Sequence, residues 1–309
     1  MTDQYLRSAS LIVGDASGNA IDLSQMRIQF MVRNGSVQTL KQADIRIFNL
    51  SDATAKQIED EFTQVQLQAG YGGNLSTIFK GTICWVYRGR LNATDSFVRI
   101  IAQDGDEAYN FAVVNQTLSA GWDPSTVYGA LSQSLSPYGV TKGYTSISGN
   151  PSPRGKVLFG MARDHLRCLA DSQKAGWGIE DGALNVVPYA TVMPGTVPVL
   201  NAQTGMIGVP EQTIQGLIVR CLLNPDIRSF GKLQIDNSAI TSLTVKQQLT
   251  GSDVVVVPSK DWDGFYVAHC VTHQGDTRGN EWQTEAICIA VDGTAPAVGP
   301  TIQDVPSGY

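Results

Sequence analysis

The sequence predicts a mainly β protein with an α+β insertion, in which two antiparallel β-barrels flank a smaller α+β domain. Alternating apolar and polar residues fill roughly the first hundred positions, helix signals begin after about Val114, and strand patterns return from about Leu200. The 309 residues are enough for two or three domains. We expect a first barrel over residues 1–113, a middle domain over 114–200, a second barrel over 201–295 and a tail over 296–309.

Strand and turn signals alternate along the first block. Residues 27–33 alternate in polarity, and the following Asn34-Gly35 predicts a hairpin turn because both residues tolerate positive φ. A second strand is expected over 43–50. Ser51 then has the position of an N-cap for a short helix over 52–62.

A second hairpin is expected over residues 69–83. The strand that leads into it alternates Val65, Leu67 and Ala69 with glutamines, the pattern of a half-buried strand. Another strand over 97–102 is expected to end in a turn at residues 103–106.

The middle block carries two helix signals. Asp123 and Pro124 are typical of an N-cap and a first helical position, so a helix is expected through Leu135. A second helix is expected over 160–174, with Gly176 as its stop. Residues 142–154 are predicted to form a loop, and 177–187 a small hairpin around Asp181-Gly182.

The last block returns to strands and partly repeats the first. Val86 is followed eleven positions later by Phe97, and Val271 is followed eleven positions later by Trp282, each pair flanking a polar turn that contains glycine. This match suggests two related barrels. The expected strands are 217–223, 232–236, 242–247, 253–257, 264–272 and 281–290.

The charge content of the chain indicates which kinds of molecule it can bind. Only 16% of residues are charged, against roughly 25% in an ordinary soluble protein, which favours a surface that meets other protein. A low-charge monomer fits the composition equally well. The net charge is −6 and no run of five basic residues occurs, which argues against sequence-independent binding to a phosphate backbone.

The chain shows no targeting pattern. Its first residues lack the basic start and apolar core of a signal peptide, and no apolar run is long enough to span a membrane. The five cysteines are scattered, so we expect buried thiols of a protein made in a reducing cytoplasm.

The three histidines do not suggest a metal site. His269 and His273 have a four-residue spacing that suits zinc on a helix, but their surroundings predict a strand. Four residues of strand span about 13 Å, whereas zinc ligands each lie about 2 Å from the metal. His165 is expected on a helix surface.

No motif for catalysis or for a cofactor is found. Residues 149–157 faintly resemble a phosphate-binding loop, but Val157 stands where a hydroxyl must hold Mg²⁺. Neither a G-x-S-x-G elbow nor an H-E-x-x-H pair occurs. We therefore predict no enzyme, no cofactor and no metal, although a carboxylate pair such as a cell-wall glycosidase needs would carry no motif.

Six stretches follow one another in a set order: GYGG at 70–73, IFKGTI at 78–83, AQDGD at 102–106, residues 160–188, TGMIGVPEQTIQGLIVRCLLNPDI at 204–227 and THQGDTRGNEWQTEA at 272–286. In this order they resemble the baseplate (tail) hub proteins of contractile-tailed bacteriophages. The resemblance covers roughly residues 60–290, and its most specific stretch is 204–227.

The resemblance implies an architecture and a set of partners. Each chain would carry two tail-tube-type barrels, and a homotrimer would arrange six barrels into a pseudo-hexameric ring. That ring would join the six-fold tail tube to the three-fold central spike and form the channel for genome ejection. The implied partners are further copies of the chain, a tail tube or tube-initiator protein, the central spike protein, baseplate wedge proteins and, as a further candidate, a tape measure protein.

The same resemblance places the protein in the virion tail baseplate, assembled in the host bacterial cytoplasm, with genome DNA passing through without specific binding. The chain ends at Tyr309 without the OB-type barrel that some relatives carry, so the spike tip is expected to be a separate protein. Two other functions stay open: a hub of a phage-like injection particle or bacteriocin, and a cell-wall-degrading tail enzyme.

The motif residues are expected to shape the backbone and not to perform a reaction. A tight bend is expected at Gly205, Gly208 and Pro210, and a strand end at Asn224-Pro225. A hairpin turn is expected at His273, Gly275 and Asp276, with Trp282 as its buried anchor. The full set is Gly70, Tyr71, Gly81, Asp104, Gly105, Gly205, Gly208, Pro210, Asn224, Pro225, His273, Gly275, Asp276 and Trp282.

Overall fold

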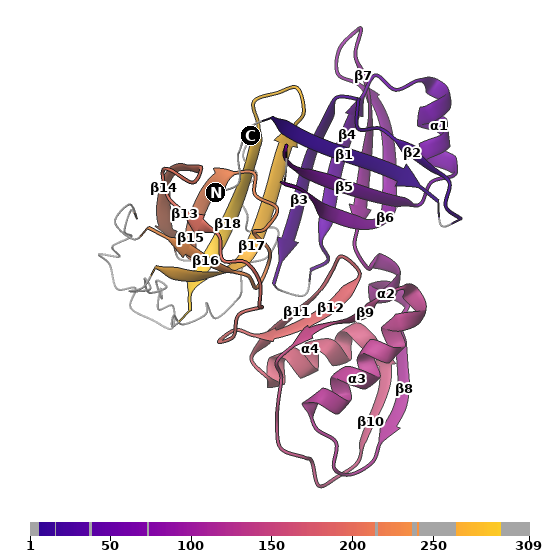
Figure 1. Ribbon diagram of the computed structural model, residues 1–309. Helices are drawn as coiled ribbons and strands as arrows, with labels where there is room; N and C mark the ends of the chain where they lie inside the picture. The colour runs from indigo at the N-terminus through magenta and orange to yellow at the C-terminus, as the bar shows by residue number, and fades with distance from the viewer. Residues whose placement is uncertain are drawn as a thin grey trace, which may run out of the picture.

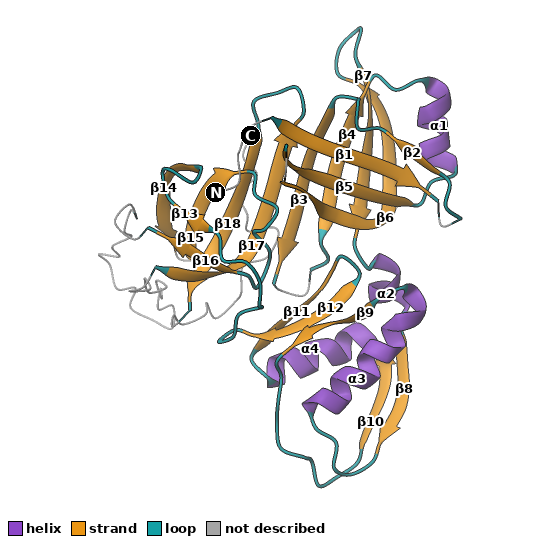
Figure 2. Ribbon diagram, in the orientation of Figure 1, coloured by secondary structure: helices purple, strands orange, loops and turns teal. Residues whose placement is uncertain are grey.

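The computed structural model shows a mainly β protein with a compact α+β region between two β blocks (Figures 1 and 2). The structure describes residues 6–15, 17–36, 39–72, 74–213, 216–236, 240 and 264–291. Two strands expected at 242–247 and 253–257, and the tail at 296–309, lie outside these residues.

The first block is built from seven strands and one helix. Val65, Leu67 and Ala69 are buried as their alternation predicts, and Ser51 caps the helix by accepting a hydrogen bond from the Thr54 amide. The elements are β1 (Arg7–Gly14), β2 (Ala20–Asp22), β3 (Ile28–Gly35), β4 (Gln42–Phe48), α1 (Asp52–Asp60), β5 (Gln64–Tyr71), β6 (Asn74–Arg90) and β7 (Ser96–Gln103).

The predicted turn at Asn34-Gly35 is wrong. Both residues continue β3, where Asn34 lies opposite Val271 and Gly35 opposite Cys270 of the last block. Neither residue has a positive φ. The local turn signal is overridden because a strand from far along the chain supplies backbone hydrogen bonds to this end of β3.

The middle region places two helices between two small sheets. Helices α3 and α4 contact each other, and Figure 2 shows them with β9, β11 and β12 on one side and β8 and β10 on the other. The elements are α2 (Asp106–Phe111), β8 (Val113–Leu118), α3 (Pro124–Leu135), the 3-10 turn η1 (Ser136–Tyr138), β9 (Thr141–Thr145), β10 (Lys156–Met161), α4 (Ala162–Ser172), β11 (Ala175–Glu180) and β12 (Ala183–Pro188).

Helix α3 and the β11–β12 hairpin match their predictions, and two other elements differ. The expected loop over 142–154 contains most of β9, because β12 offers it a parallel partner. The second helix starts at Ala162, since Gly160 and Met161 belong to β10 and pair with β8. It ends before Lys174, whose φ is +48°, so Gly176 lies in β11 and is not the stop.

The last block consists of strands. Strand β17 runs to Asp276, four residues beyond the prediction, and pairs along its length with β18. The elements are β13 (Val199–Leu200), β14 (Met206–Thr213), β15 (Gly216–Leu222), β16 (Lys232–Ile235), β17 (Phe265–Asp276) and β18 (Trp282–Ala290).

One continuous sheet joins the two β blocks. Its main path runs β14-β15-β18-β17-β3-β4-β7-β6-β5-β1-β2, and the connection between the blocks is the antiparallel pairing of β17 with β3. In Figure 1 the yellow β17–β18 hairpin lies directly beside the indigo β3. The described strands form no closed barrel. The two β blocks together make one thirteen-stranded sheet.

Each block has its own hydrophobic core, and the last block also contributes side chains to the core of the first. The core of the first block includes Leu223 and Trp282 from the last block. Trp282 is 2% exposed and meets Phe30 edge-on, with ring centroids 5.5 Å apart. The last block therefore contributes to the first block's core as well as to its sheet.

The β6–β7 and β17–β18 hairpins share a feature that supports their sequence likeness. In each, a glycine lies opposite the aromatic residue at or near the start of the second strand: Gly89 opposite Phe97, and Gly275 opposite Trp282. A Cβ at Gly89 would lie 2.6 Å from the Phe97 ring, and one at Gly275 would lie 2.8 Å from the Trp282 ring. Each ring thus occupies the space that a side chain would fill.

Candidate functional site

A buried polar cluster lies where the three parts of the chain meet. We call it the junction cluster. Lys41 precedes β4, Asp104 follows β7, Glu180 and Asp181 lie at the β11–β12 turn, and Arg228 and His273 come from the last block. Three parts distant in sequence therefore place charged or polar groups in one interior region, which is also lined by Asn34 and Pro225. The members are Lys41, Asp104, Glu180, Asp181, Arg228 and His273.

Lys41 is the central cation of the junction cluster. Its side chain is 5% exposed, and its ammonium donates to Asp181 Oδ1 at 2.9 Å and lies 3.8 Å from Glu180 Oε1. The half-exposed Arg228 lies 3.9 Å from the other oxygen of Asp181. A buried ammonium needs such partners, because an unpaired charge in an apolar interior costs several kcal/mol, on the order of the whole net stability of a domain.

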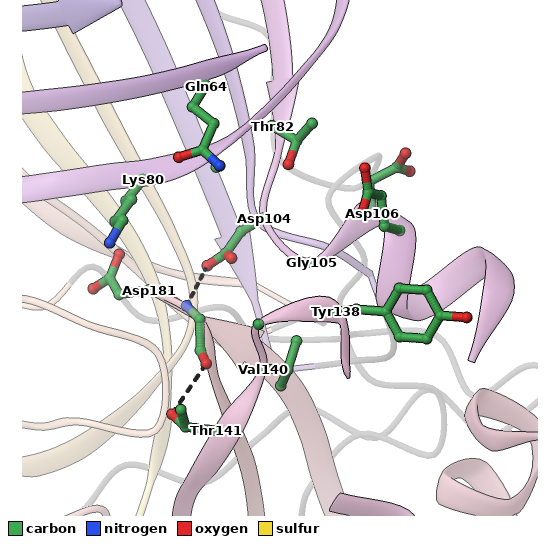
Figure 3. Close-up of a pocket in the computed structure, with 14 residues that line it drawn as sticks. Gln64, Lys80, Thr82, Asp104, Gly105, Asp106, Tyr138, Val140, Thr141 and Asp181 are labelled. Atoms are coloured by element: carbon green, nitrogen blue, oxygen red, sulfur yellow. Dashed lines mark hydrogen bonds between the residues drawn. The ribbon is translucent and has the colours of Figure 1, made fainter. Parts of the chain in front are cut away.

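Asp104 has an unusual proton affinity for a carboxylate. Burial raises its pKa to about 7, Lys41 acts in the opposite direction, and the neighbouring Asp181 raises the pKa further. Its carboxylate accepts a hydrogen bond from the Gly182 amide at 3.3 Å, as Figure 3 shows. Burial likewise raises the pKa of Glu180. Burial therefore favours the protonated form of both carboxyl groups.

Asp104→Asn is expected to remove a pH dependence of stability. The carboxyl titrates near 7 in the folded state and near 3.9 when unfolded, so the folded state holds a proton that the unfolded chain has released. Stability therefore falls as pH rises from about 4 to 7 and changes little above that range. The variant should unfold at higher urea concentration than the parent at pH 8, and at a similar concentration at pH 4.

Asp123→Asn is the matched control for this measurement. Asp123 caps α3 at the surface, and its hydrogen bonds with Thr126 lower its pKa, so its contribution to stability grows as pH rises. The two variants should shift the pH profile in opposite directions. A destabilised Asp104→Asn chain at pH 8 would mean that the Asp104 carboxylate is charged and favourably paired with Lys41.

His269 and His273 are buried and each lies within hydrogen-bond distance of a hydroxyl group. His269 lies 2.8 Å from the Ser36 hydroxyl and His273 lies 2.8 Å from the Thr284 hydroxyl. Burial lowers the pKa of His269 to about 4 and that of His273 to about 3. Within the described part of the chain, no three His, Cys, Asp or Glu side chains are placed to hold a metal ion. The half-buried His165 ring lies 3.2 Å from the Phe159 carbonyl oxygen on β10.

The prediction of buried thiols holds for three of the five cysteines. Cys221, Cys270 and Cys288 are buried, Cys84 is half-buried, and all five are free thiols. Cys168 is exposed on α4, which corrects that part of the prediction. No helix in the described ranges has the length and apolar character to cross a bilayer.

An open cavity of about 360 Å³ lies between the first block and the middle region (Figure 3). Its walls come from the β5–β6 hairpin, the start of α2 and the β11–β12 turn. Gly105, with φ +70°, allows the close approach, since a Cβ there would lie 2.7 Å from Ile179. Polar lining residues include Gln64, Lys80, Thr82, Asp104, Asp106 and Thr141.

The motif residues of the first block lie at strand ends and close approaches. Gly70 and the buried Tyr71 end β5. Gly81 sits where β6 passes from β5 to β7, and a Cβ there would lie 2.5 Å from the Gln103 carbonyl oxygen. Gly81 therefore permits one long strand to pair with two partners in succession.

The motif residues of the last block make a bend and a strand end. Gly205 and Gly208 have φ of +92° and +71°, and the β14 register shifts between Ile207 and Glu211, a segment that contains Pro210. Asn224 and Pro225 follow the end of β15. There the Asn224 amide donates to Thr284, and its side-chain oxygen accepts from the Asp226 amide.

The predicted hairpin turn needs correction. His273 and Gly275 lie within β17, opposite Thr284 and Trp282, because the strand is longer than its pattern indicated. Asp276 ends the strand. It accepts hydrogen bonds from the Arg27 guanidinium, the shorter at 2.7 Å, and so joins the two β blocks a second time.

Sequence reasoning missed Lys41, Glu180 and Arg228. Each is a single charged residue with no motif around it. Only the folded structure, which brings these residues close together, distinguishes them from surface charges. The turn signal at Asp181-Gly182 gave the position of one member but not its role. A buried cluster of this kind has no linear signature.

Two strands of the continuous sheet, one in each β block, have an edge that no described strand covers. Over Trp85–Arg90, β6 pairs with β7 alone, and β14 pairs with β15 alone among the described strands. Exposed apolar side chains accompany both edges: Trp85 is 53% and Tyr87 49% exposed on β6, and Val209 is 55% exposed on β14. Open strand edges beside apolar side chains are typical of surfaces that pair with another chain.

The fold is that of phage tail proteins. No family model and no curated protein matches the sequence. Among solved structures, the 43 kDa tail protein of prophage MuSo2 from Shewanella oneidensis is 7% identical with a TM-score of 0.59, covering 94% of this chain and all of that one. The tail protein of Neisseria meningitidis is 11% identical with a TM-score of 0.57, covering 92% and 97%.

A third similar structure comes from a secretion machine. It is an Escherichia coli component of the type VI secretion system, described as structurally similar to tail proteins of bacteriophage T4. The identity is 10% and the TM-score 0.53, over 89% of this chain and 77% of that one. At such identities the likeness concerns the fold alone.

Proposed function

We propose that this chain is a structural baseplate hub of a phage contractile tail. Three copies would form a ring with pseudo-six-fold symmetry that joins the tail tube to the central spike and surrounds the channel for genome ejection. The observation that carries this proposal is the continuous sheet with one open strand edge in each β block, in a chain that has a tail-protein fold.

The sheet suits a head-to-tail ring. A cyclic trimer needs two different surfaces on each chain, one for each neighbour. The open edge of β6 at Trp85–Arg90 and the open edge of β14 are two such surfaces. Pairing the β6 edge of one copy with the β14 edge of the next would continue the sheet around the ring, with the two β blocks of each chain supplying the tail-tube-type units.

The outer face of the sheet suits a channel wall. On the side away from the first block's core, neighbouring strands present glutamines, the Arg99–Asp44 pair and two further arginines, Arg33 and Arg46. These are single charges in a chain with a net charge of −6 and no basic run, so this wall would let DNA pass without strong binding. The glutamines are Gln29, Gln42, Gln103, Gln274 and Gln283.

The ring predicts a specific effect of edge substitutions. The purified parent chain should have a mass about three times 33.2 kDa by light scattering, alone or with tube and spike proteins, and should show a central hole in negative stain. The double variant Trp85→Glu, Tyr87→Glu should be monomeric but still folded, because it places two carboxylates at the open edge of β6, away from the core of the first block.

Leu75→Glu is the matched control. Leu75 is 40% exposed on the first half of the same strand, where β5 already covers the edge. This variant should remain a trimer. Two results would contradict the proposed hub function. One is a parent chain that stays monomeric with its partners present, and the other is a position away from the central axis of an assembled particle.

The hub of a phage-like injection particle is the alternative within the same fold. The likeness in fold to the secretion-system component supports this alternative. Capsid genes beside the gene for this chain would support the virion. The acidic cavity near Asp104 is the place where a cell-wall hydrolase would act, and dye release from labelled peptidoglycan tests it. We expect no release.

A further inference from the structure

The junction cluster holds more acids than bases. Burial lowers the pKa of its histidine, His273, to about 3, so that ring adds no positive charge near neutral pH. The other members are two bases and three acids: Lys41, Arg228, Asp104, Glu180 and Asp181. With all three acids ionised, the cluster would carry one negative charge without a partner. Because such a charge is costly in a protein interior, one carboxyl group should hold a proton while the three regions stay in contact.

Asp104 is the acid best placed to hold that proton. Asp181 receives the Lys41 ammonium at 2.9 Å, and Glu180 lies 3.8 Å from the same nitrogen. Asp104 is only 4% exposed and makes no salt bridge with any residue of the described ranges. Burial without an ion pair favours the neutral carboxyl group, in agreement with its pKa of about 7.

The contacts of Asp104 join the first block to the middle region. Its amide donates to the Lys41 carbonyl oxygen at 2.9 Å, and its carboxyl group accepts from the Gly182 amide in the β11–β12 turn at 3.3 Å. The open cavity of about 360 Å³ lies directly beside these contacts, with Asp104, Asp181 and Gly182 in its wall (Figure 3). Water therefore reaches this side of the cluster, and the turn has space beside it.

We propose that the junction cluster is a pH-sensitive contact, which holds the β11–β12 turn against the end of β7 while one carboxyl group is protonated and loosens when all three are ionised. Once both are charged, Asp104 and Asp181 repel each other, and water from the cavity solvates them in the loosened state. The proposal is independent of the proposed function, because it concerns contacts within one chain.

The other charged groups around the cavity act in the same direction. Lys80 comes from β6, and Asp106 and Glu107 come from the start of α2. They add one base and two acids to the surroundings of Asp104. Ionisation of Asp104 therefore adds a negative charge to a wall that is already acidic.

Hydrogen exchange in the parent chain tests the proposal. Mass spectrometry gives the protection of peptides from the β11–β12 turn, after correction for the intrinsic exchange rate at each pH. Because opening releases one proton, the opening equilibrium should rise roughly tenfold per pH unit from pH 5 and level off above about pH 7. Low urea concentrations should change this exchange little, since a local opening exposes little surface.

Two variants identify the group that titrates. Asp104→Asn keeps an acceptor for the Gly182 amide and removes the charge, so the protection of the turn should vary less than about twofold over the same pH range. Asp106→Asn is the matched control, because it removes an acid from the wall of the same cavity but not from the junction cluster. Its pH dependence should equal that of the parent chain.

Three results would overturn the proposal. The first is protection of the turn that does not depend on pH in the parent chain, a result that needs no variant to fold. The second is exchange of the turn with the same urea dependence as peptides from β17, which would mean that the turn opens only in global unfolding. The third is a pH dependence that survives in Asp104→Asn.

Discussion

Lys41→Met should lower the free energy of unfolding by about 3–5 kcal/mol, because it leaves Glu180 and Asp181 without their buried cation. The methionine fills a similar volume, so loss of charge and not of packing is the cause. Since the three partners come from the first block and the middle region, contact between these regions should weaken first. Denaturant unfolding at pH 8, where the carboxyls are most fully ionised, measures the effect.

Arg88→Met, made in the monomeric Trp85→Glu, Tyr87→Glu chain, is the comparison for an ion pair in water. Arg88 meets Glu59 at 3.0 Å, but the two side chains are 35% and 48% exposed. Solvent screens such a pair, and its removal should cost no more than about 1 kcal/mol. Similar losses in the two variants would show that the junction cluster is hydrated and would remove the reason for the perturbed pKa of Asp104.

Trp282→Ala should cost a further large amount, about 3–5 kcal/mol, because it empties a site in the first block's core that the last block fills. The ring is 2% exposed and meets Phe30 edge-on. We expect a lower melting temperature and greater proteolysis at the boundary of the two β blocks. Calorimetry with limited proteolysis measures both.

Trp85→Ala controls for the loss of an indole. Trp85 is 53% exposed, so its removal should change the melting temperature of the isolated chain little. It should weaken the trimer instead, since Trp85 borders the open edge of β6. A large loss of stability from Trp85→Ala, or a small one from Trp282→Ala, would contradict the placement of these two rings.

Sequence patterns predicted the elements whose signals are local. The Asp123-Pro124 start gave α3 its bounds, Ser51 gave the start of α1, and Asp181-Gly182 gave a turn in which both residues have positive φ. The mainly β class with a central α+β region also followed from periodicity. These features depend on contacts within a few residues, which the sequence displays directly.

The predictions that were wrong concern residues whose structure depends on strands far away in the sequence. Asn34-Gly35 is a strong turn signal, yet β17 holds both residues in a strand. The strands around residues 142–145 and 160–161 exist because β12 and β8 lie beside them. The separation into two barrels likewise could not anticipate the pairing of β17 with β3, and the junction cluster assembles from isolated charges. At these positions tertiary contacts, and not local sequence preferences, decide whether a strand forms.

The pairing of β3 with β17 has a consequence for how the chain is made. Ribosomes add on the order of 5–20 residues per second, so β3 emerges at least about ten seconds before the strand that borders it. During that interval one edge of β3 has no strand beside it, and the core of the first block lacks Trp282. Contacts of such long sequence separation also slow folding. The protein can therefore acquire its final fold only after almost the whole chain has been synthesised.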